Sequence, residues 1–158
     1  MLFRSISCAQ KSIRIVTPYF LPPDPLTMAL GLAALRGVKV DIVLPERSNH
    51  TILDWARRVP LRPLIVAGCN VWLRSAPFDH SKLMVIDDAW TLIGSANWDT
   101  RSFRLNFELN VELHDPAFAR QIVAETTVSQ RLGLTDLDAD PLPVRLRSGA
   151  ARLLQPYL

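Results

Sequence analysis

Long uncharged runs are missing from this chain of 158 residues. The longest, at positions 25–35 and 63–73, each span eleven residues, whereas a membrane-spanning helix needs roughly eighteen or more. The Met1 end also lacks the charged and apolar regions that make up a signal peptide. We therefore expect no transmembrane segment and no signal peptide in this chain.

Cysteine and histidine are scarce, with two and three residues respectively. Cys8 and Cys69 fit neither a disulfide framework nor a metal site by their spacing, and the histidines are scattered. The sequence therefore predicts no bound metal and no cofactor. It favours a reducing, cytosol-facing environment.

The charge pattern lacks the long basic stripe that a nucleic-acid groove requires, although the formal net charge is +3. The four tryptophans are spaced as core or loop residues and not as a platform for stacked bases. Nucleic acid is therefore not an expected partner.

Basic residues do gather near the C-terminal end, where Arg145, Arg147 and Arg152 lie close to Leu146 and Leu153. A basic amphipathic tail suits anionic lipid headgroups and predicts peripheral membrane contact. The alternative is that these leucines pack on the core of their own domain, as short C-terminal helices usually do.

One stretch carries most of the chemical information, because its polar residues follow the pattern H-x-K-x4-D-x6-G-S-x-N. Six residue types at fixed spacing, each about one in twenty by ordinary usage, match by chance about once in a million such chains. The residues that form the pattern are His80, Lys82, Asp87, Gly94, Ser95 and Asn97.

Histidine and lysine at this spacing suit attack on a phosphodiester. Such an anion requires a nucleophile that is neutral near pH 7 and cationic donors that stabilise the transition state. Imidazole, with an unperturbed pKa of about 6.5, and the lysine ammonium meet these needs. A strand is expected over 82–87. If His80 also belongs to it, His80 and Lys82 leave the strand on one face and point into one site.

The end of the pattern offers further phosphate ligands. Asn97 follows a strand-like run at 90–93 and a Gly94–Ser95 turn, so its amide is expected to donate to the same phosphate. Ser95 is assigned to phosphate binding, with a role in the fold as the alternative. Asp99, Arg101 and Ser102 come next, and they are expected to lock a loop.

The pattern resembles the signature of the phospholipase D superfamily. Nearly the whole chain looks like the second half of bacterial cardiolipin synthases of the phospholipase D type, which join two phosphatidylglycerols and release glycerol. The segments that carry this likeness beyond the pattern are 17–22, 34–40, 94–108 and 152–158. The resemblance implies a phosphatidyltransferase with a phosphohistidine intermediate at His80, in the bacterial cytoplasm or at the cytoplasmic face of the inner membrane.

The resemblance also implies roles for two carboxylates. Glu108 belongs to an N-x-E element at 106–108, whose glutamate orients the nucleophilic histidine in the family. Asp87 is the acidic member of the catalytic pattern and is interpreted as holding turns or backbone, not as a proton donor. The predicted catalytic set is therefore His80, Lys82, Asp87 and Glu108.

Only one copy of the pattern is present, whereas the resembled synthases carry two. In-line displacement needs an acid on the leaving-group side, and a single histidine cannot fill both positions in one step. Neither His50 nor His114 has the following lysine and aspartate. We expect a second histidine from a homodimer or from a second phospholipase D-type half.

Phosphatidylglycerol is the expected lipid substrate. The alternatives are a hydrolytic phosphodiesterase or nuclease acting as a homodimer, and an inactive pairing module.

The order of predicted elements gives an α/β fold, with a mixed β-sheet flanked by helices on both faces in a single phospholipase D-like domain. The catalytic domain is expected over 1–135, and a proline-containing linker with a short amphipathic helix over 136–158. Helices are expected over 2–11, 25–36, 51–67 (broken by Pro60 and Pro63), 116–130 and 144–158. Strands are expected over 13–17, 38–44, 70–74, 82–87, 90–93 and 107–113.

Overall fold

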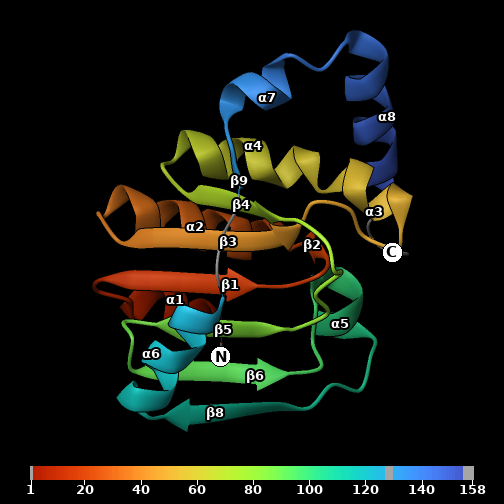
Figure 1. The fold of residues 1–158 in the computed structure, drawn as a ribbon. Helices are drawn as coiled ribbons and strands as arrows, with labels where there is room; N and C mark the ends of the chain where they lie inside the picture. The colour runs from red at the N-terminus through yellow and green to blue at the C-terminus, as the bar shows by residue number, and fades with distance from the viewer. Residues whose placement is uncertain (1, 127–129, 155–158) are drawn as a thin grey trace.

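A seven-stranded sheet forms the centre of the computed structural model, which describes residues 2–126 and 130–154 (Figure 1). Its strand order is β8-β6-β5-β1-β3-β4-β9. The three neighbours β1, β3 and β4 run parallel, and the other four strands pair antiparallel, so the sheet is mixed as the sequence predicted. The strands are β1 (Ser12–Val16), β3 (Lys39–Pro45), β4 (Asn70–Arg74), β5 (Leu83–Ile86), β6 (Trp90–Gly94), β8 (Asn110–His114) and β9 (Gln130–Leu132).

Helices cover both faces of this sheet, and one face holds the main apolar core. Ile15 lies opposite Ile42 on β3 and opposite Met84 on β5, so all three side chains share a face. All three are fully buried against the neighbouring helices. The helices on this face are α1 (Leu2–Cys8), α2 (Asp24–Leu35) and α4 (Arg58–Val66), and α6 (Pro116–Glu125) lies on the other.

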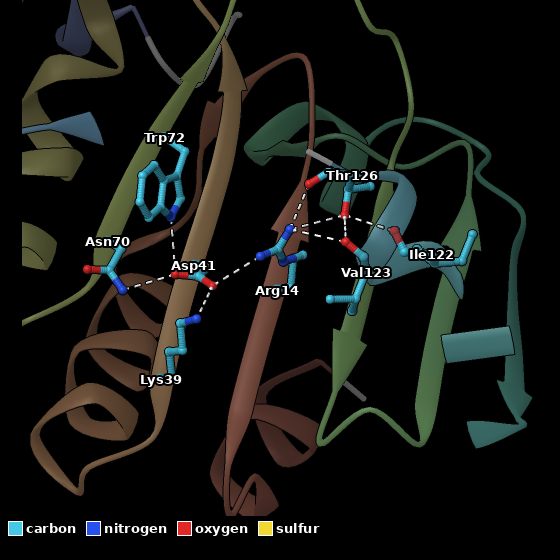
Figure 2. A network of polar contacts seen from close by, with 8 residues as sticks. All are labelled: Arg14, Lys39, Asp41, Asn70, Trp72, Ile122, Val123 and Thr126. Carbon is cyan, nitrogen blue, oxygen red and sulfur yellow. Dashed lines mark hydrogen bonds and ion pairs between the residues drawn. The ribbon is translucent and has the colours of Figure 1, made fainter. Parts of the chain in front are cut away.

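The opposite face carries a polar network that attaches α6 to the sheet (Figure 2). Arg14 donates to the carbonyl of Thr126 (2.7 Å), just beyond the helix, and to the carboxylate of Asp41 (3.3 Å). Asp41 also accepts from Asn70 Nδ2 (2.9 Å) and Trp72 Nε1 (3.1 Å). Burial opposes ionisation of Asp41, but these donors outweigh it and lower its pKa, so Asp41 stays charged beside Arg14.

Short elements surround the sheet. Two of them, β2 and β7, pair as a separate parallel ribbon, which brings residues from early and late in the chain together. The elements are β2 (Phe20–Leu21), α3 (Thr51–Ala56), β7 (Trp98–Asp99), α5 (Thr100–Arg104), α7 (Leu134–Asp138) and α8 (Leu142–Leu153).

The predicted helix over 51–67 is interrupted, but not at its prolines. Helices α3 and α4 meet at Arg57, and both Pro60 and Pro63 lie within α4. The Arg57 guanidinium donates to the carbonyls of Pro45 (2.8 Å) and Glu46 (2.9 Å). Pro60 is tolerated because backbone N–H groups in the first helical turn have no partner within the helix.

The predicted helix over 116–130 was too long, since α6 ends at Glu125. Residues 127–129 lie outside the described part of the chain. Residues 130–132 form β9, which pairs antiparallel with β4 at the edge of the sheet and was not predicted. Three residues are too few to show an alternating pattern in sequence, so only the pairing with β4 reveals this strand.

The C-terminal region contains more helix than the predicted linker. Pro141 is the N-cap residue of α8 and Pro143 lies in its first turn, so the two prolines begin the helix. Ala151 of α8 is buried against α3, whereas Leu146 and Leu153 are exposed and do not pack on the core. Of the predicted helix over 144–158, residues 155–158 lie outside the described chain. The division at residues 135 and 136 stays a prediction.

Two of the tail arginines contact the body of the protein. Arg152 forms an ion pair with Asp24 (3.1 Å), and the guanidinium of Arg147 lies 4.2 Å from the centre of the Trp55 ring. These contacts hold α8 against the first turn of α2 and against α3. Across the described residues, no helix has both the length and the apolar character needed to cross a bilayer.

Candidate active site

The antiparallel strands β5, β6 and β8 bring most of the predicted site residues to one end of the sheet. His80 and Lys82 precede β5, Asn97 follows β6, and Glu108 precedes β8. Because neighbouring strands run in opposite directions, the start of β5, the end of β6 and the start of β8 lie together. Asp87 follows β5 and therefore lies at the opposite end of the sheet.

His80 lies outside the strand, so His80 and Lys82 do not share a strand face. Strand β5 begins at Leu83, so both residues lie in the segment before it. Asp79 accepts a hydrogen bond from the backbone N–H of Ser81 (2.9 Å), a local turn that competes with strand pairing. The two side chains nevertheless meet, because the loop folds Lys82 back onto His80.

The ammonium group of Lys82 contacts both ring nitrogens of His80. Lys82 Nζ lies 3.1 Å from Nδ1 and 3.4 Å from Nε2, and it donates to the His80 backbone carbonyl (2.8 Å). Tyr19 and Phe78 flank the imidazole, with ring centres 5.9 Å and 5.7 Å from it.

This environment favours the neutral imidazole. Partial burial lowers the pKa of His80, the positive charge of Lys82 lowers it further, and the carboxylate of Asp79 opposes both effects. The net direction is below the ordinary value of about 6.5, so the unprotonated ring predominates at neutral pH. His80 also remains exposed to solvent and to any bound substrate.

The carboxylate of Glu108 is held by neighbouring polar groups. The Ser95 hydroxyl donates to Oε2, and Asn106 Nδ2 donates to Oε1 (3.1 Å). Burial opposes ionisation, but hydrogen bonds from Ser95, Asn106 and Ser102 and the charge of Lys82 lower the pKa of Glu108. In the part of the chain that the structure describes, no hydrogen bond joins Glu108 to His80. The orienting role of Glu108 therefore stays a prediction.

The strand predicted over 107–113 begins later, at Asn110, which leaves Glu108 in a loop. The cause lies at Ser95, whose hydroxyl accepts from the backbone N–H of Leu109 (3.0 Å) and so replaces a strand partner. Gly94 permits this close crossing, since a Cβ there would lie 2.3 Å from the Leu109 carbonyl oxygen. Ser95 thus fixes the loop and Glu108 together.

Sequence reasoning gave Asp99 and Ser102 only a loop-locking role, and the structure places them beneath the site. Asp99 Oδ1 accepts from the backbone N–H of Ser102 (2.6 Å) and caps α5, while the Ser102 hydroxyl accepts from the backbone N–H of Asn97 (3.2 Å). Burial and the nearby charge of Glu108 raise the pKa of Asp99, against its hydrogen bonds from Ser102. The D-x-x-S spacing was the available signal, because it is typical of a helix N-cap.

Asp87, at the far end of the sheet, binds backbone. Its carboxylate accepts from the N–H groups of Gln10 (2.9 Å), Lys11 (2.7 Å) and Ser12 (2.9 Å), which join α1 to β1. Burial opposes ionisation, but these donors lower the pKa of Asp87. A catalytic contribution from Asp87 therefore stays a prediction.

Asp87→Asn is expected to destabilise the fold by about 2 kcal/mol near neutral pH, because hydrogen bonds to a charged group are lost. Asparagine tolerates the positive φ of 54° at this position, so backbone strain does not contribute to the difference in stability between wild type and variant. Because the pKa of Asp87 is lower in the folded protein than in the unfolded chain, the ionised carboxylate stabilises the fold at pH values above the unfolded pKa of about 3.9. This stabilisation is lost as pH falls through the folded-state pKa. Chemical denaturation from pH 7 to pH 3 should show the gap between wild type and variant begin to narrow below about pH 4 and keep narrowing as pH falls towards the lowered folded-state pKa. A gap of unchanged size at pH 3 would contradict the assignment.

The site contains paired charges in place of a metal-ligand cluster. Among residues 2–126 and 130–154, no three His, Cys, Asp or Glu side chains gather around a common centre. Lys82 instead experiences the charges of Glu108, Asp99 and Asp79, which partly offset the effect of burial in lowering its pKa. The arrangement places the His80 imidazole, the Lys82 ammonium and the ionised Glu108 carboxylate at one end of the sheet. Lys82 lines one pocket with His80 and another with Glu108.

Solved structures of other proteins share this fold. Nuc from Salmonella typhimurium, a phospholipase D family member, superposes with a TM-score of 0.70 and 26% identity, over 78% of this chain and 80% of that chain. Phosphatidylserine synthase of Haemophilus influenzae superposes over 99% of this chain and 44% of its own, with a TM-score of 0.76 and 21% identity. The fold is therefore that of the phospholipase D class.

Sequence comparison identifies a particular family within the phospholipase D class. Residues 2–127 match the family described as cardiolipin synthase, PLD-like domain. The chain is 37% identical to the major cardiolipin synthase ClsA of Bacillus subtilis and 34% identical to a cardiolipin synthase of Clostridium perfringens, over 98% and 99% of its length. It spans about a third of the length of these relatives, 33% and 34%. The chain belongs to the phospholipase D-like domain family of cardiolipin synthases.

Proposed function

We propose that this chain provides one catalytic half of a phosphatidyltransferase that makes cardiolipin from phosphatidylglycerol. The observation that carries the proposal is the exposed His80 ring, whose pKa is lowered by partial burial and by the Lys82 ammonium 3.1 Å from its Nδ1. The relatives named cardiolipin synthases, which match 98% or more of the chain, support the lipid substrate. The cytoplasmic face of a bacterial inner membrane is the matching location.

The reaction divides into two displacements at phosphorus. A ring nitrogen of His80 attacks the phosphodiester of one phosphatidylglycerol, an N–P bond forms, and the bond to glycerol breaks. A second histidine protonates the departing glycerol oxygen. The primary hydroxyl of another phosphatidylglycerol then attacks the phosphohistidine and gives up its proton to that histidine, which yields cardiolipin and restores His80.

Lys82 and the neighbouring polar groups would stabilise the negative charge on the phosphoryl oxygens. Bound phosphate would attract the Lys82 ammonium away from His80, which frees the ring for attack and neutralises the phosphoryl oxygens. The amide of Asn97 is a further donor at the same end of the sheet. The hydroxyl of Ser95 would join it by exchanging its bond to Glu108 for one to phosphate. Glu108 would stabilise the imidazolium as the N–P bond forms.

The second histidine must come from outside the described chain, because His50 and His114 lack the surrounding pattern. A surface suited to a partner lies beside the site, where four exposed apolar side chains alternate along the loop into β8. These side chains are Leu105, Phe107, Leu109 and Val111. An exposed apolar strip on an edge strand is typical of an interface. A second phospholipase D-type half bound there would bring its own histidine towards His80.

Phe107→Glu is expected to weaken this pairing at least about 30-fold, because a fully exposed aromatic beside Glu108 is the expected anchor of the interface. Analytical ultracentrifugation of the chain, alone and with a co-expressed first half, measures the effect. Val66→Glu is the matched control, since Val66 is also an exposed apolar residue but lies at the end of α4. Pairing unchanged in Phe107→Glu would exclude this surface.

A hydrolytic phosphodiesterase is the second candidate, and the match to Nuc favours it. This chain covers 80% of Nuc, a single chain of similar size, so a pair of identical chains could form a complete site. What distinguishes the two activities is whether an alcohol or water accepts the phosphoryl group. No described residue decides between these acceptors.

Light scattering combined with product analysis tests the proposal. The same preparation is given phosphatidylglycerol vesicles and bis(p-nitrophenyl) phosphate, with and without a co-expressed first half. Cardiolipin and glycerol as products would support the transferase, whereas phosphatidic acid would indicate the hydrolase. A paired but inactive protein on both substrates would overturn both candidates and leave a pairing module.

A further inference from the structure

An apolar cavity of about 470 Å³ opens beside the catalytic charges. Its walls come from α1, α2, the strands β5 and β6, and the segment that leads into α5. The apolar lining includes Leu26, Met84, Leu92, Trp98 and Phe103. Of the site residues proposed above, Lys82 and Glu108 line this space, whereas His80, Ser95 and Asn97 do not.

The cavity has a charged end and an apolar end. Lys82, Ser102 and Glu108 line it together, and they form one cluster because Glu108 bonds to Ser102 and attracts Lys82. Met84 and Leu92 lie directly opposite each other on β5 and β6. Both face the apolar core beneath α1 and α2, so the cavity leads from the site's charges towards those helices.

This combination selects for a ligand with two parts. The Lys82 ammonium at one end suits a phosphate, while the apolar walls release water at little cost and favour hydrocarbon. A cavity of this volume holds about fifteen water-sized groups at roughly 30 Å³ each, enough for most of one hydrocarbon chain. Phosphate and hydrocarbon are joined through only a short glycerol linker in a phospholipid.

We propose that the cavity holds one acyl chain of the phosphatidyl group while its phosphorus is bound at His80. This inference rests on the proposed function for the identity of the substrate and adds a binding site for its chain. The site would position the phosphodiester relative to His80 and select substrates by chain length. A partner side chain in the same cavity is the competing occupant.

A series of alkyl phosphates tests this site without requiring turnover. Titration calorimetry with butyl, hexyl, octyl and decyl phosphate, and with glycerol phosphate as the chain-free probe, is performed on the protein in its native assembly. Binding is expected to tighten by about threefold to fourfold for each added methylene until the cavity is full. Equal affinity across the series would overturn the proposal. It would also indicate that the cavity is closed or occupied by a partner.

Leu26→Trp fills the cavity from α2 and is expected to abolish the dependence on chain length, leaving the affinity for glycerol phosphate unchanged. Leu35→Trp is the matched control, because Leu35 lies on the same helix but is exposed and outside the cavity. Leu92→Phe replaces Leu26→Trp if the latter is shown by circular dichroism to be unfolded. Chain-length dependence that survives in the folded, filled variant would overturn the proposal.

The result of the test for an acyl-chain site can be distinguished from the result of the test for transferase activity. A protein that prefers longer chains but turns over no lipid has the acyl site without the transferase activity. A protein that makes cardiolipin yet binds all alkyl phosphates equally has the activity without the acyl site, and the proposal then fails alone.

Discussion

His80→Ala is expected to reduce phosphodiester turnover by at least about 10⁴-fold, because it removes the group to which phosphorus becomes bonded. The fold should be unaffected, since the side chain is exposed and, within the described residues, its ring nitrogens make polar contacts only with neighbouring Lys82. Turnover is measured with phosphatidylglycerol vesicles and a chromogenic phosphodiester, beside a thermal melt of each protein. Rapid quenching followed by phosphorus NMR should detect phosphohistidine in wild type and not in the variant.

His50→Ala provides a close control for that substitution. His50 is also exposed, and its ring also packs near Tyr19, with ring centres 5.6 Å apart compared with 5.9 Å for His80. It should retain turnover within about twofold, because it lacks the lysine partner. Equal losses in the two variants would show that packing on Tyr19, and not nucleophilic attack, explains the effect.

Lys82→Met is expected to reduce turnover by about 10²- to 10³-fold, the usual loss when one preorganised donor to a transition-state charge is removed. Methionine keeps the length and apolar stem of lysine and removes only the charge and its donors. The loss should lie mainly in kcat, because the charge on phosphorus is greatest in the transition state. Steady-state kinetics on the chromogenic phosphodiester separates kcat from KM.

Lys11→Met controls for the change in net charge, since Lys11 lies at the opposite end of the sheet beside Asp87. It should leave kcat unchanged. The pKa of His80 provides a second measurement. Removing the Lys82 charge should raise that pKa, because the positive charge is one of the causes that lower it. An unchanged kcat in Lys82→Met, or a lower His80 pKa measured by NMR, would contradict the assignment.

Both predictions concern residues that the sequence alone singled out. Fixed spacing placed His80, Lys82, Ser95 and Asn97 in one candidate site, and the structure brings these segments to one end of the sheet. Spacing succeeds here because each group lies next to a strand end, so local chain geometry sets its place. The mixed sheet with helices on both faces also follows from the order of apolar segments.

The starts of β5 and β8 and the existence of β9 could not be predicted from the sequence pattern. The turn at Asp79 places His80 and Lys82 before β5, and the Ser95 hydroxyl that binds Leu109 delays the start of β8. Each is a hydrogen bond from a backbone N–H to a side-chain oxygen that displaces strand pairing, and strand propensity does not register such bonds. Strand β9 similarly exists through its pairing with β4, a contact between residues about sixty positions apart.

The sequence by itself determined the residues of the candidate site, because the histidine, the lysine and their spacing are local properties of one loop. It also predicted that a second histidine comes from a homodimer or from a second phospholipase D-type half. Only the tertiary structure decided what surrounds that chemistry: which backbone N–H groups bind Asp87, the bonds from Ser95 and Asn106 to Glu108, and an apolar cavity under α1 and α2. The physical reason is that cavities and long-range hydrogen bonds depend on how distant segments pack, which no local pattern records.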